Sequence, residues 1–426
     1  MLKIGLYITF LTVCFFGHAQ SDSTRAFKLG LEFRPRFEFR DGYRSLPSTA
    51  TDAAFFVSTR SRLLLDFKTK KSAFHASIQD VRVWGQNGSF PATNGLSLFE
   101  AYATFNLGKN NAWSLKAGRQ AVELDNGRLF SKANWNQFSR AHDGLHLNYS
   151  ASKLSTDFML FYNQVGAFSF GTFYPLNHYK YLANHYLKYA LSDRFTLNVL
   201  NSFDGYQSQG STSTVYVRGT SGGRLTYKKK AFKATIAAYY QYGQLQSGQR
   251  VSAFYLQPEV SFKIKRLEIR AGMEYLSGED NTVSGDVNRS FCTLYGVAFK
   301  FNGHLNYFTS FPADANGAGL INPYLFFDYK ISKKLRLKFD SHLFYSQSDL
   351  LDIDNNIANP YLGFETDLKL KYEMNADIDF DFGISTMIPT ASMSTLKTGD
   401  YLQKPLFSFL MFTWKPTLFE VEQKIK

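Results

Sequence analysis

Residues 26–42 read AFKLGLEFRPRFEFRDG, and their side chains alternate between two kinds. Phenylalanine and leucine occupy most odd positions, whereas lysine, arginine and glutamate occupy most even positions. A period of two residues predicts a β-strand with one apolar face and one charged face. The architecture therefore depends on which face of this strand lies inside the molecule.

The first twenty residues have the pattern of a secretory signal peptide. Lys3 precedes an apolar run over residues 4–16, and Gly17, His18 and Ala19 provide a small-residue exit. This run is too short for a membrane-spanning helix, so we expect residues 1–20 to be removed. The mature chain then keeps Cys292 alone, which excludes an intrachain disulfide and a cysteine-based metal cluster.

Composition excludes a helical membrane protein. After residue 20 the sequence contains no apolar run of the length that a spanning helix needs, and the mean hydropathy is −0.25. Aromatic residues make up 17% of the chain, and prolines number only 11. We find no linker and no low-complexity block, so we predict that residues 21–426 form one large closed domain.

The alternating pattern recurs along the chain in stretches about long enough to cross a bilayer as tilted strands. The connections between these stretches also alternate, between short polar turns and long loops, which is typical of an outer-membrane β-barrel. We predict an all-β antiparallel transmembrane barrel of about 18 strands (18–20), because residues 291–308 read either as two strands or as part of a loop. The clearest strand-like stretches are 57–67, 99–106, 232–242, 267–275, 335–340 and 377–385.

In such a barrel the apolar faces meet lipid and the charged faces line the lumen. The charged face of residues 26–42 is then the inside, and Arg34, Arg36 and Arg40 point inward. A barrel of this size is too wide for its own side chains to fill and leaves an aqueous channel, so we predict a porin. Short turns are expected in the periplasm and long loops outside the cell.

The formal net charge is +13, and the inward positions carry bases and acids in similar numbers. Arg34, Arg36, Arg60 and Arg62 lie on adjacent predicted strands and would form a basic stripe, with the acidic residues 377–381 opposite. Guanidinium groups bind carboxylates through two parallel hydrogen bonds, which favours an anion path. The alternative is that these charges pair across neighbouring strands and only stiffen the lumen. Three further arginines are expected to line the pore: Arg224, Arg270 and Arg336.

Several stretches resemble the alginate-export family of outer-membrane porins: SIQDVRVWGQ (77–86), LKAGRQAVELDNGRLF (115–130), SRAHDGLHLNY (139–149) and YLGFETDLKLKY (361–372). The most specific part is LKAGRQ followed by R-x-x-D-G at residues 140–144. The resemblance implies an 18-stranded monomeric barrel with an arginine-rich conduit for an anionic uronate polysaccharide. It also implies a set of residues along the path: Asp80, Arg82, Glu100, Arg119, Gln120, Arg128, Arg140 and Asp143.

Two features depart from the family pattern. The chain ends in EVEQKIK rather than on an aromatic residue, which predicts a short C-terminal periplasmic tail, and the lumen carries many acids. Alternation also fails locally, since Arg119 shares a face with Leu115, and Asp80 shares one with Ile78. A β-bulge near these residues, or a position above the bilayer, would resolve the conflict.

No pattern indicates catalysis or a cofactor. Asp349, Asp352 and Asp354 lie in one loop without the glycine of a calcium-binding loop, so we expect a solvated loop and no metal. The expected partners are outer-membrane lipid and an anionic polysaccharide or small anionic solutes, and no nucleic acid. Two alternatives stay open: a general diffusion porin without charge preference, and a barrel with enzymatic activity in its lumen or at its rim.

Overall fold

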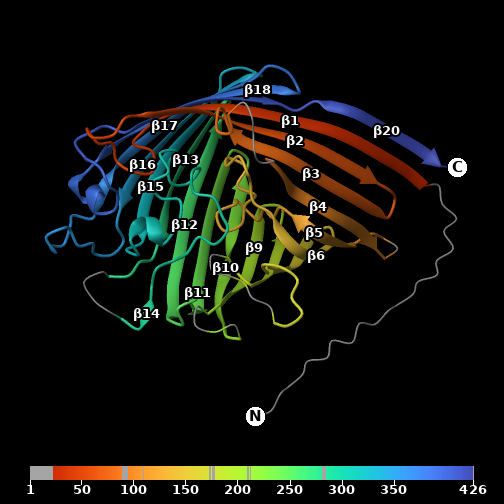
Figure 1. Ribbon diagram of the computed structural model, residues 1–426, viewed down its shortest axis with the longest axis horizontal. Coiled ribbons are helices and arrows are strands. Elements are labelled where there is room, and N and C mark those ends of the chain that lie inside the picture. The colour runs from red at the N-terminus through yellow and green to blue at the C-terminus, as the bar shows by residue number, and fades with distance from the viewer. Residues whose placement is uncertain are drawn as a thin grey trace, which may run out of the picture.

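A computed structural model of the protein describes residues 23–88, 95–108, 110–171, 174, 178–208, 211, 213–280 and 285–425. The strands form one sheet that closes into a barrel (Figure 1). Closure is made at β1, which pairs antiparallel with β2 along one edge and with β19 and then β20 along the other. The expected signal peptide lies outside the described residues.

Eighteen strands build the wall, because β14 is a two-residue bridge inside a loop and because β19 and β20 follow one another along β1. Neither of the two described helices is long and apolar enough to cross a membrane. The strands are β1 (Ser23–Asp41), β2 (Ala54–Lys68), β3 (Ser72–Val83), β4 (Leu96–Leu107), β5 (Trp113–Gln120), β6 (His142–Ser150), β7 (Leu154–Tyr162), β8 (Tyr181–Ala190), β9 (Phe195–Gln207), β10 (Val215–Lys229), β11 (Phe232–Gln244), β12 (Arg250–Ile264), β13 (Leu267–Leu276), β14 (Val287–Asn288), β15 (Leu320–Lys330), β16 (Leu335–Tyr345), β17 (Tyr361–Glu373), β18 (Ile378–Pro389), β19 (Leu406–Trp414) and β20 (Thr417–Ile425), and the 3-10 helices are η1 (Ala313–Ala315) and η2 (Ala391–Thr395).

The charged face of β1 lies inside, as predicted. Glu32 and Arg34 are buried, whereas Phe37 on the opposite face is exposed. The same holds far along the chain, where Ile236 of β11 is exposed outward and Thr235 beside it is buried. An apolar exterior suits a sheet whose backbone groups all pair internally and whose outer face meets hydrocarbon.

The connections sort into two rims, as the sequence predicted. Residues 69–71, 151–153 and 265–266 make tight turns at one rim, called here the turn rim. Residues 121–141 and 277–319 belong to the long connections at the other rim, called here the loop rim. These two long loops do not stay at the rim but fold into the lumen, where they contact the barrel wall.

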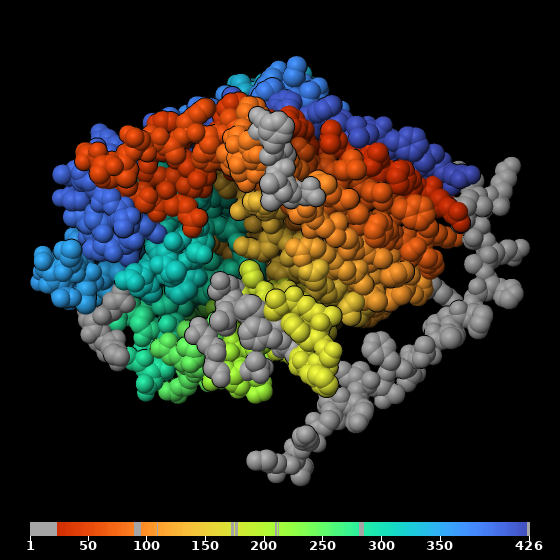
Figure 2. Space-filling view, viewed as in Figure 1, coloured from red at the N-terminus to blue at the C-terminus, as the bar shows by residue number. Residues whose placement is uncertain are grey.

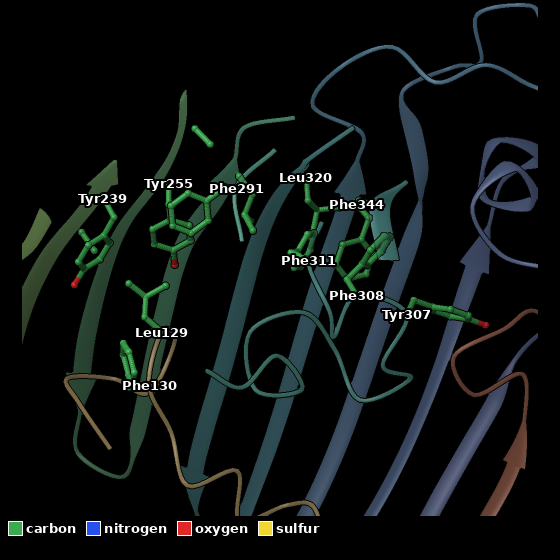
Figure 3. Packing of buried hydrophobic residues seen from close by; sticks show 14 of the residues in the cluster. Leu129, Phe130, Tyr239, Tyr255, Phe291, Tyr307, Phe308, Phe311, Leu320 and Phe344 are labelled. Carbon is green, nitrogen blue, oxygen red and sulfur yellow. The ribbon is translucent and has the colours of Figure 1, made fainter. Parts of the chain in front are cut away.

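Residues 291–308, which the sequence left open between strands and loop, belong to the 277–319 loop. Phe291 and Phe308 are buried against wall residues, with ring centroids 5.4 Å from Tyr255 and 4.9 Å from Phe344. Figure 3 shows these aromatic side chains gathered on the inner side of the wall strands. Residues 291–308 therefore alternate because one side of the segment packs against the wall, and they do not form a membrane-spanning strand.

The C-terminus differs from the sequence-based expectation of a short tail. Thr417–Ile425 forms β20, whose backbone pairs with the first residues of β1. Phe419 continues the outer apolar face beside Phe27, with ring centroids 6.1 Å apart, and Glu420 lies 3.4 Å from Lys28 on the inner face. The segment extends the last strand because its alternation matches that of β1.

A β-bulge interrupts the pairing of β3 with β4, but it does not resolve the conflict of alternation that the sequence showed. The extra residue lies on β4, β3 pairs with β2 in unbroken register, and β5 pairs without a shift, so Asp80 stays on the face of Ile78 and Arg119 on the face of Leu115. The register shifts between Ser77 and Ile78, so that Phe99 is an extra residue on β4. Phe99 is buried under Arg62, whose guanidinium lies 3.9 Å from the ring centroid. The bulge lets two successive residues of β4, Phe99 and Glu100, serve the inner side.

Candidate functional site in the barrel lumen

The 121–141 loop crosses the lumen from one side of the wall to the other. Near its end, residues 134–139 bind arginines of β1 and β2. Near its start, Asp125 forms an ion pair of 3.4 Å with Arg224 of β10, and Asn126 donates to Gln257 of β12 at 3.2 Å. The loop therefore divides the lumen into a part near the loop rim and a part near the turn rim.

The arginines of the predicted basic stripe do lie together, but the 121–141 loop covers them. Arg34 is 3% exposed and donates to Gln137 Oε1 at 2.7 Å and to the Asn134 carbonyl at 2.8 Å. Arg60 is completely buried, pairs with Glu32 and donates to Ser139. These charges hold the loop in place instead of facing a water-filled path.

The other two arginines of the stripe are also engaged. Arg36 donates to the Trp135 carbonyl at 2.7 Å, pairs with Glu38 at 2.8 Å, and has its guanidinium 4.1 Å from the centroid of the Trp135 ring. Arg62 donates to Gln79 at 2.9 Å. The expectation of an exposed stripe is thus corrected, because the sequence does not reveal which loop folds over these strands.

Arg128 is the central anchor of the two lumen loops. It is 2% exposed and forms a bidentate ion pair with Glu274 of β13, at 2.8 and 3.0 Å. Its remaining donors reach Asn302 at 2.8 Å and the Val297 carbonyl at 3.1 Å, both in the 277–319 loop. One side chain therefore joins both loops to the wall.

Backbone hydrogen bonds join the two loops directly. The Tyr295 N–H donates to the Leu129 carbonyl at 2.9 Å, and the Val297 N–H donates to the Gly127 carbonyl at 3.1 Å. Gly296 lies between them, and a Cβ there would stand 1.8 Å from the Arg128 carbonyl oxygen. Only glycine permits this close approach of the two backbones.

A turn of the 277–319 loop is also held by carboxylates of the wall. The Leu305 N–H donates to Glu365 at 2.8 Å and the His304 N–H donates to Asp367 at 3.2 Å, and both carboxylates belong to β17. Gly303 has a φ of +81°, and a Cβ there would collide with the Glu365 carboxylate. Burial lowers the pKa of His304 to about 4.

Among the cavities that described residues line, two lie in the lumen on either side of these loops. The turn-side cavity has a volume of about 790 Å³ and the loop-side cavity about 620 Å³. Phe299 lines both, so the two cavities meet at its ring. Figure 2 shows the hollowed face of the barrel, with the teal part of the chain around residue 300 lying between the orange and green walls.

Aromatic rings surround this meeting point. Trp135 of the 121–141 loop stacks on Phe299 with ring centroids 5.0 Å apart, and Phe409 of β19 packs edge-on against Trp135 at 4.8 Å. His304 lies 5.6 Å from Phe299. Residues of both lumen loops and of the wall therefore surround the place where the two cavities adjoin, which is called here the passage.

Basic residues outnumber acidic residues around both cavities. Arg140, at the end of the 121–141 loop, donates to the carbonyls of Tyr295 and Gly296 and lines the loop-side cavity. The loop-side cavity is lined by Arg36, Arg40, Arg44, Arg82 and Arg140 against Glu38, and the turn-side cavity by Lys188, Arg224, Lys233, Arg270, Lys300, Lys338 and Lys369 against Asp125, Glu259, Glu268, Asp328 and Asp340.

Some residues inferred from the family resemblance lie away from the cavities. Arg119 and Asp143 pair with each other across β5 and β6, on the face that also carries the exposed Leu145. Arg82 pairs with Asp80 at 2.6 Å at the edge of the loop-side cavity. The first pair lies on the outer face of the barrel rather than along a conduit.

The remaining predicted residues have structural partners. Glu100 accepts a hydrogen bond from the Ala121 N–H at 2.8 Å and so holds the start of the 121–141 loop, next to the buried Gln120. Arg270 lines the turn-side cavity 3.5 Å from Glu259, whereas Arg336 pairs with Asp328 near the turn rim. Arg270 and Arg336 therefore follow the alternative considered from the sequence, in which inward charges pair across neighbouring strands.

Several lining bases escaped the sequence analysis, namely Arg44, Lys188, Lys300 and Lys369. Lys300 lies in the segment whose strand or loop character was undecided. Its exposed position next to Phe299 depends on how the 277–319 loop folds, for which the sequence gives no direct signal.

The model of the family described as alginate export matches residues 25–395. The chain belongs to the alginate export family. Comparison with curated proteins finds no significant match. Similar solved structures include Pseudomonas aeruginosa OpdO, with 13% identity, a TM-score of 0.62 and coverage of 92% of this chain and 98% of that chain. Acinetobacter baumannii OccAB4 has 12% identity, a TM-score of 0.61 and the same coverage.

A third similar structure is that of Pseudomonas aeruginosa OpdK with vanillate, with 10% identity, a TM-score of 0.60, and coverage of 92% of this chain and 98% of that chain. At such identities the likeness concerns the fold alone. This member of the alginate export family thus has the closed barrel of outer-membrane porins, with two lumen loops that narrow it.

Proposed function

We propose that the protein is a passive outer-membrane channel for anionic solutes, and that carboxylate-bearing sugars of the uronate type are its first candidate substrates. The observation that carries the proposal is the pair of cavities that meet at Phe299, each lined by more bases than acids. The proposal also includes cleavage of the signal peptide after residue 19 or 20, and a barrel that is monomeric.

The charge of the lining supports anions over cations. Five arginines face one glutamate in the loop-side cavity, and seven bases face five acids in the turn-side cavity. At physiological ionic strength a charge is screened over about 8 Å, so the bases that line the cavities still act on an ion that passes within that distance. Arginines at the walls offer paired donors that match a carboxylate.

The narrow passage supports small or extended substrates. Phe299 lines both cavities and Trp135 stacks on it, so we expect a solute to pass from one cavity to the other beside these two rings, where a bulky folded molecule would collide with them. A sugar ring presents flat apolar faces that suit aromatic side chains, while its carboxylate suits the bases nearby. A uronate oligomer that moves along its own axis meets both requirements.

Planar bilayers test the proposal with the purified full-length barrel. A KCl gradient is expected to give a reversal potential of the sign that indicates preference for chloride, and this preference should weaken in molar salt. An oligo-uronate added to one side should block the current at lower concentration than a neutral oligosaccharide of the same length. A cation-selective channel, or equal block by the two sugars, would contradict the proposal; the second result would indicate a general diffusion porin.

A further inference from the structure

The bases around the cavities differ in whether a carboxylate already neutralises them. Ion pairs engage Arg224 with Asp125, Arg270 with Glu259 and Lys369 with Asp381. A base in such a pair presents little net charge to a passing ion. The charge that a solute meets is therefore set by the bases that remain unpaired.

Lys300 is one of these unpaired bases. Its side chain is exposed, and no carboxylate of the described residues forms an ion pair with it. Its ammonium group lies 5.2 Å from the centroid of the Phe301 ring and close to Gly127 of the other lumen loop. Lys188 and Lys233 are also unpaired among the described residues, but they belong to wall strands.

The place of Lys300 in the lumen distinguishes it from these wall lysines. It directly follows Phe299, the residue that lines both cavities, so it stands at the turn-side entrance of the narrow passage. Arg224, Arg270 and Lys338 lie near enough to act on it electrostatically, as does Glu123. A solute that passes Phe299 must come close to this ammonium group.

We propose that Lys300 is the specificity-determining residue of the channel, which draws anionic groups through the passage at Phe299. This inference rests on the proposed function. Coulomb attraction over about 4 Å in water corresponds to about a fivefold preference for an anion, and a narrow lumen strengthens it. The paired bases and the wall lysines add a background field, and Arg44 and Arg140, which form no ion pair among the described residues, line the loop-side cavity rather than the turn-side entrance.

Replacement of Lys300 by glutamine tests the inference in planar bilayers. We expect Lys300→Gln to lower the chloride-to-potassium permeability ratio about fivefold, with little change in conductance. The matched control is Lys188→Gln, which removes an exposed and unpaired base of the same cavity away from the passage. The control is expected to change the ratio much less.

A second variant separates charge from shape. Lys300→Arg should keep the anion preference, and should keep it at alkaline pH, because a guanidinium stays protonated there. In the wild type, loss of water around the ammonium group lowers the pKa of Lys300, and Arg270, Lys338 and Arg224 lower it further against the effect of Glu123. The preference should then fall as the pH rises toward the ordinary lysine range, more steeply in the wild type than in Lys300→Arg.

The possible failures are distinguishable. An anion-selective wild type whose ratio changes equally in Lys300→Gln and Lys188→Gln would overturn the role of Lys300 and leave the proposed function intact. Equal alkaline profiles of the wild type and Lys300→Arg would also overturn it. A wild type without anion preference would refute the proposed function itself.

Discussion

Replacing Arg128 with methionine removes a buried side chain of the 121–141 loop that binds both the wall and the 277–319 loop. Arg128 and Glu274 are 2% and 0% exposed, so the variant leaves a buried carboxylate without its partner. Breaking a buried ion pair in this way costs about 3–5 kcal/mol. Since about 1.4 kcal/mol is a factor of ten, the balance between docked and released loops shifts by about two to four orders of magnitude.

Single-channel recording measures this shift. With its anchor lost, the 121–141 loop should leave the passage part of the time, which gives larger conductance and strong current noise. The double variant Arg128→Met, Glu274→Gln should recover much of the wild-type behaviour, because a neutral amide needs no counter-charge and can still bind Asn302 and Tyr255.

Arg336→Met serves as the control for Arg128→Met. Its partner Asp328 lies near the turn rim, and the side chain of Arg336 is 43% exposed. A pair of this kind contributes about 0–1 kcal/mol, so conductance and noise should stay at wild-type values. If Arg128→Met behaved like this control, the loops would be held by something other than the buried pair, and the reasoning would fail.

Three further predictions concern topology, the lipid face and pH. With the native cysteine replaced by serine, Asp41→Cys should react with an impermeant thiol reagent on whole cells and Lys229→Cys should not; the reverse labelling would overturn the orientation. Ile236→Arg places a charge on the lipid face, which costs about 2–4 kcal/mol near the bilayer midplane. This variant should show less of the heat-modifiable folded band on electrophoresis, whereas Lys233→Gln on the inner face should show as much as the wild type. Burial lowers the pKa of His304 from 6.5 to about 4, so as the pH falls the 277–319 loop binds a proton more readily when it is released than when it is docked. Docking of this loop should be complete above about pH 6.5 and weaken toward pH 4. The current noise should therefore rise as the pH falls, and it should rise less in His304→Gln.

The wall of the barrel could be predicted because its signal is local. On β1 the alternation of Phe37 with Arg36 and Glu38 reports the two faces directly, and burial confirms the assignment. The same alternation assigns Asp80 and Arg119 to the faces of Ile78 and Leu115, and the regular pairing of β3 with β2 and of β5 with β6 agrees with that assignment. Neighbouring residues alone decide such features.

The lumen could not be predicted in the same way. Nothing near Arg34 in the sequence indicates that Gln137, 103 residues further on, covers its guanidinium. Apolar and polar side chains alternate in the 291–308 segment because one side of it packs on the wall, and a membrane-spanning strand would show the same alternation. Lys300 was missed for this reason. Arg119 is a different case, because the family resemblance placed it on the path although alternation put it on the apolar face with Leu115, where the structure has it.

The seam at β1 has a consequence for the order in which the molecule can assemble. β2, the partner along one edge, begins at Ala54, whereas the partners along the other edge begin at Leu406 and Thr417. Until the last two strands arrive, β1 keeps a row of unpaired backbone groups, which hydrocarbon does not tolerate.

Joining strands so far apart in sequence also carries an entropic cost, and such non-local pairing is intrinsically slow. We therefore expect β1 to be fully paired, and the barrel to be stable in the bilayer, only after β19 and β20 have been added. We also expect insertion to accompany closure, and a chain that lacks β19 to leave the edge of β1 unpaired.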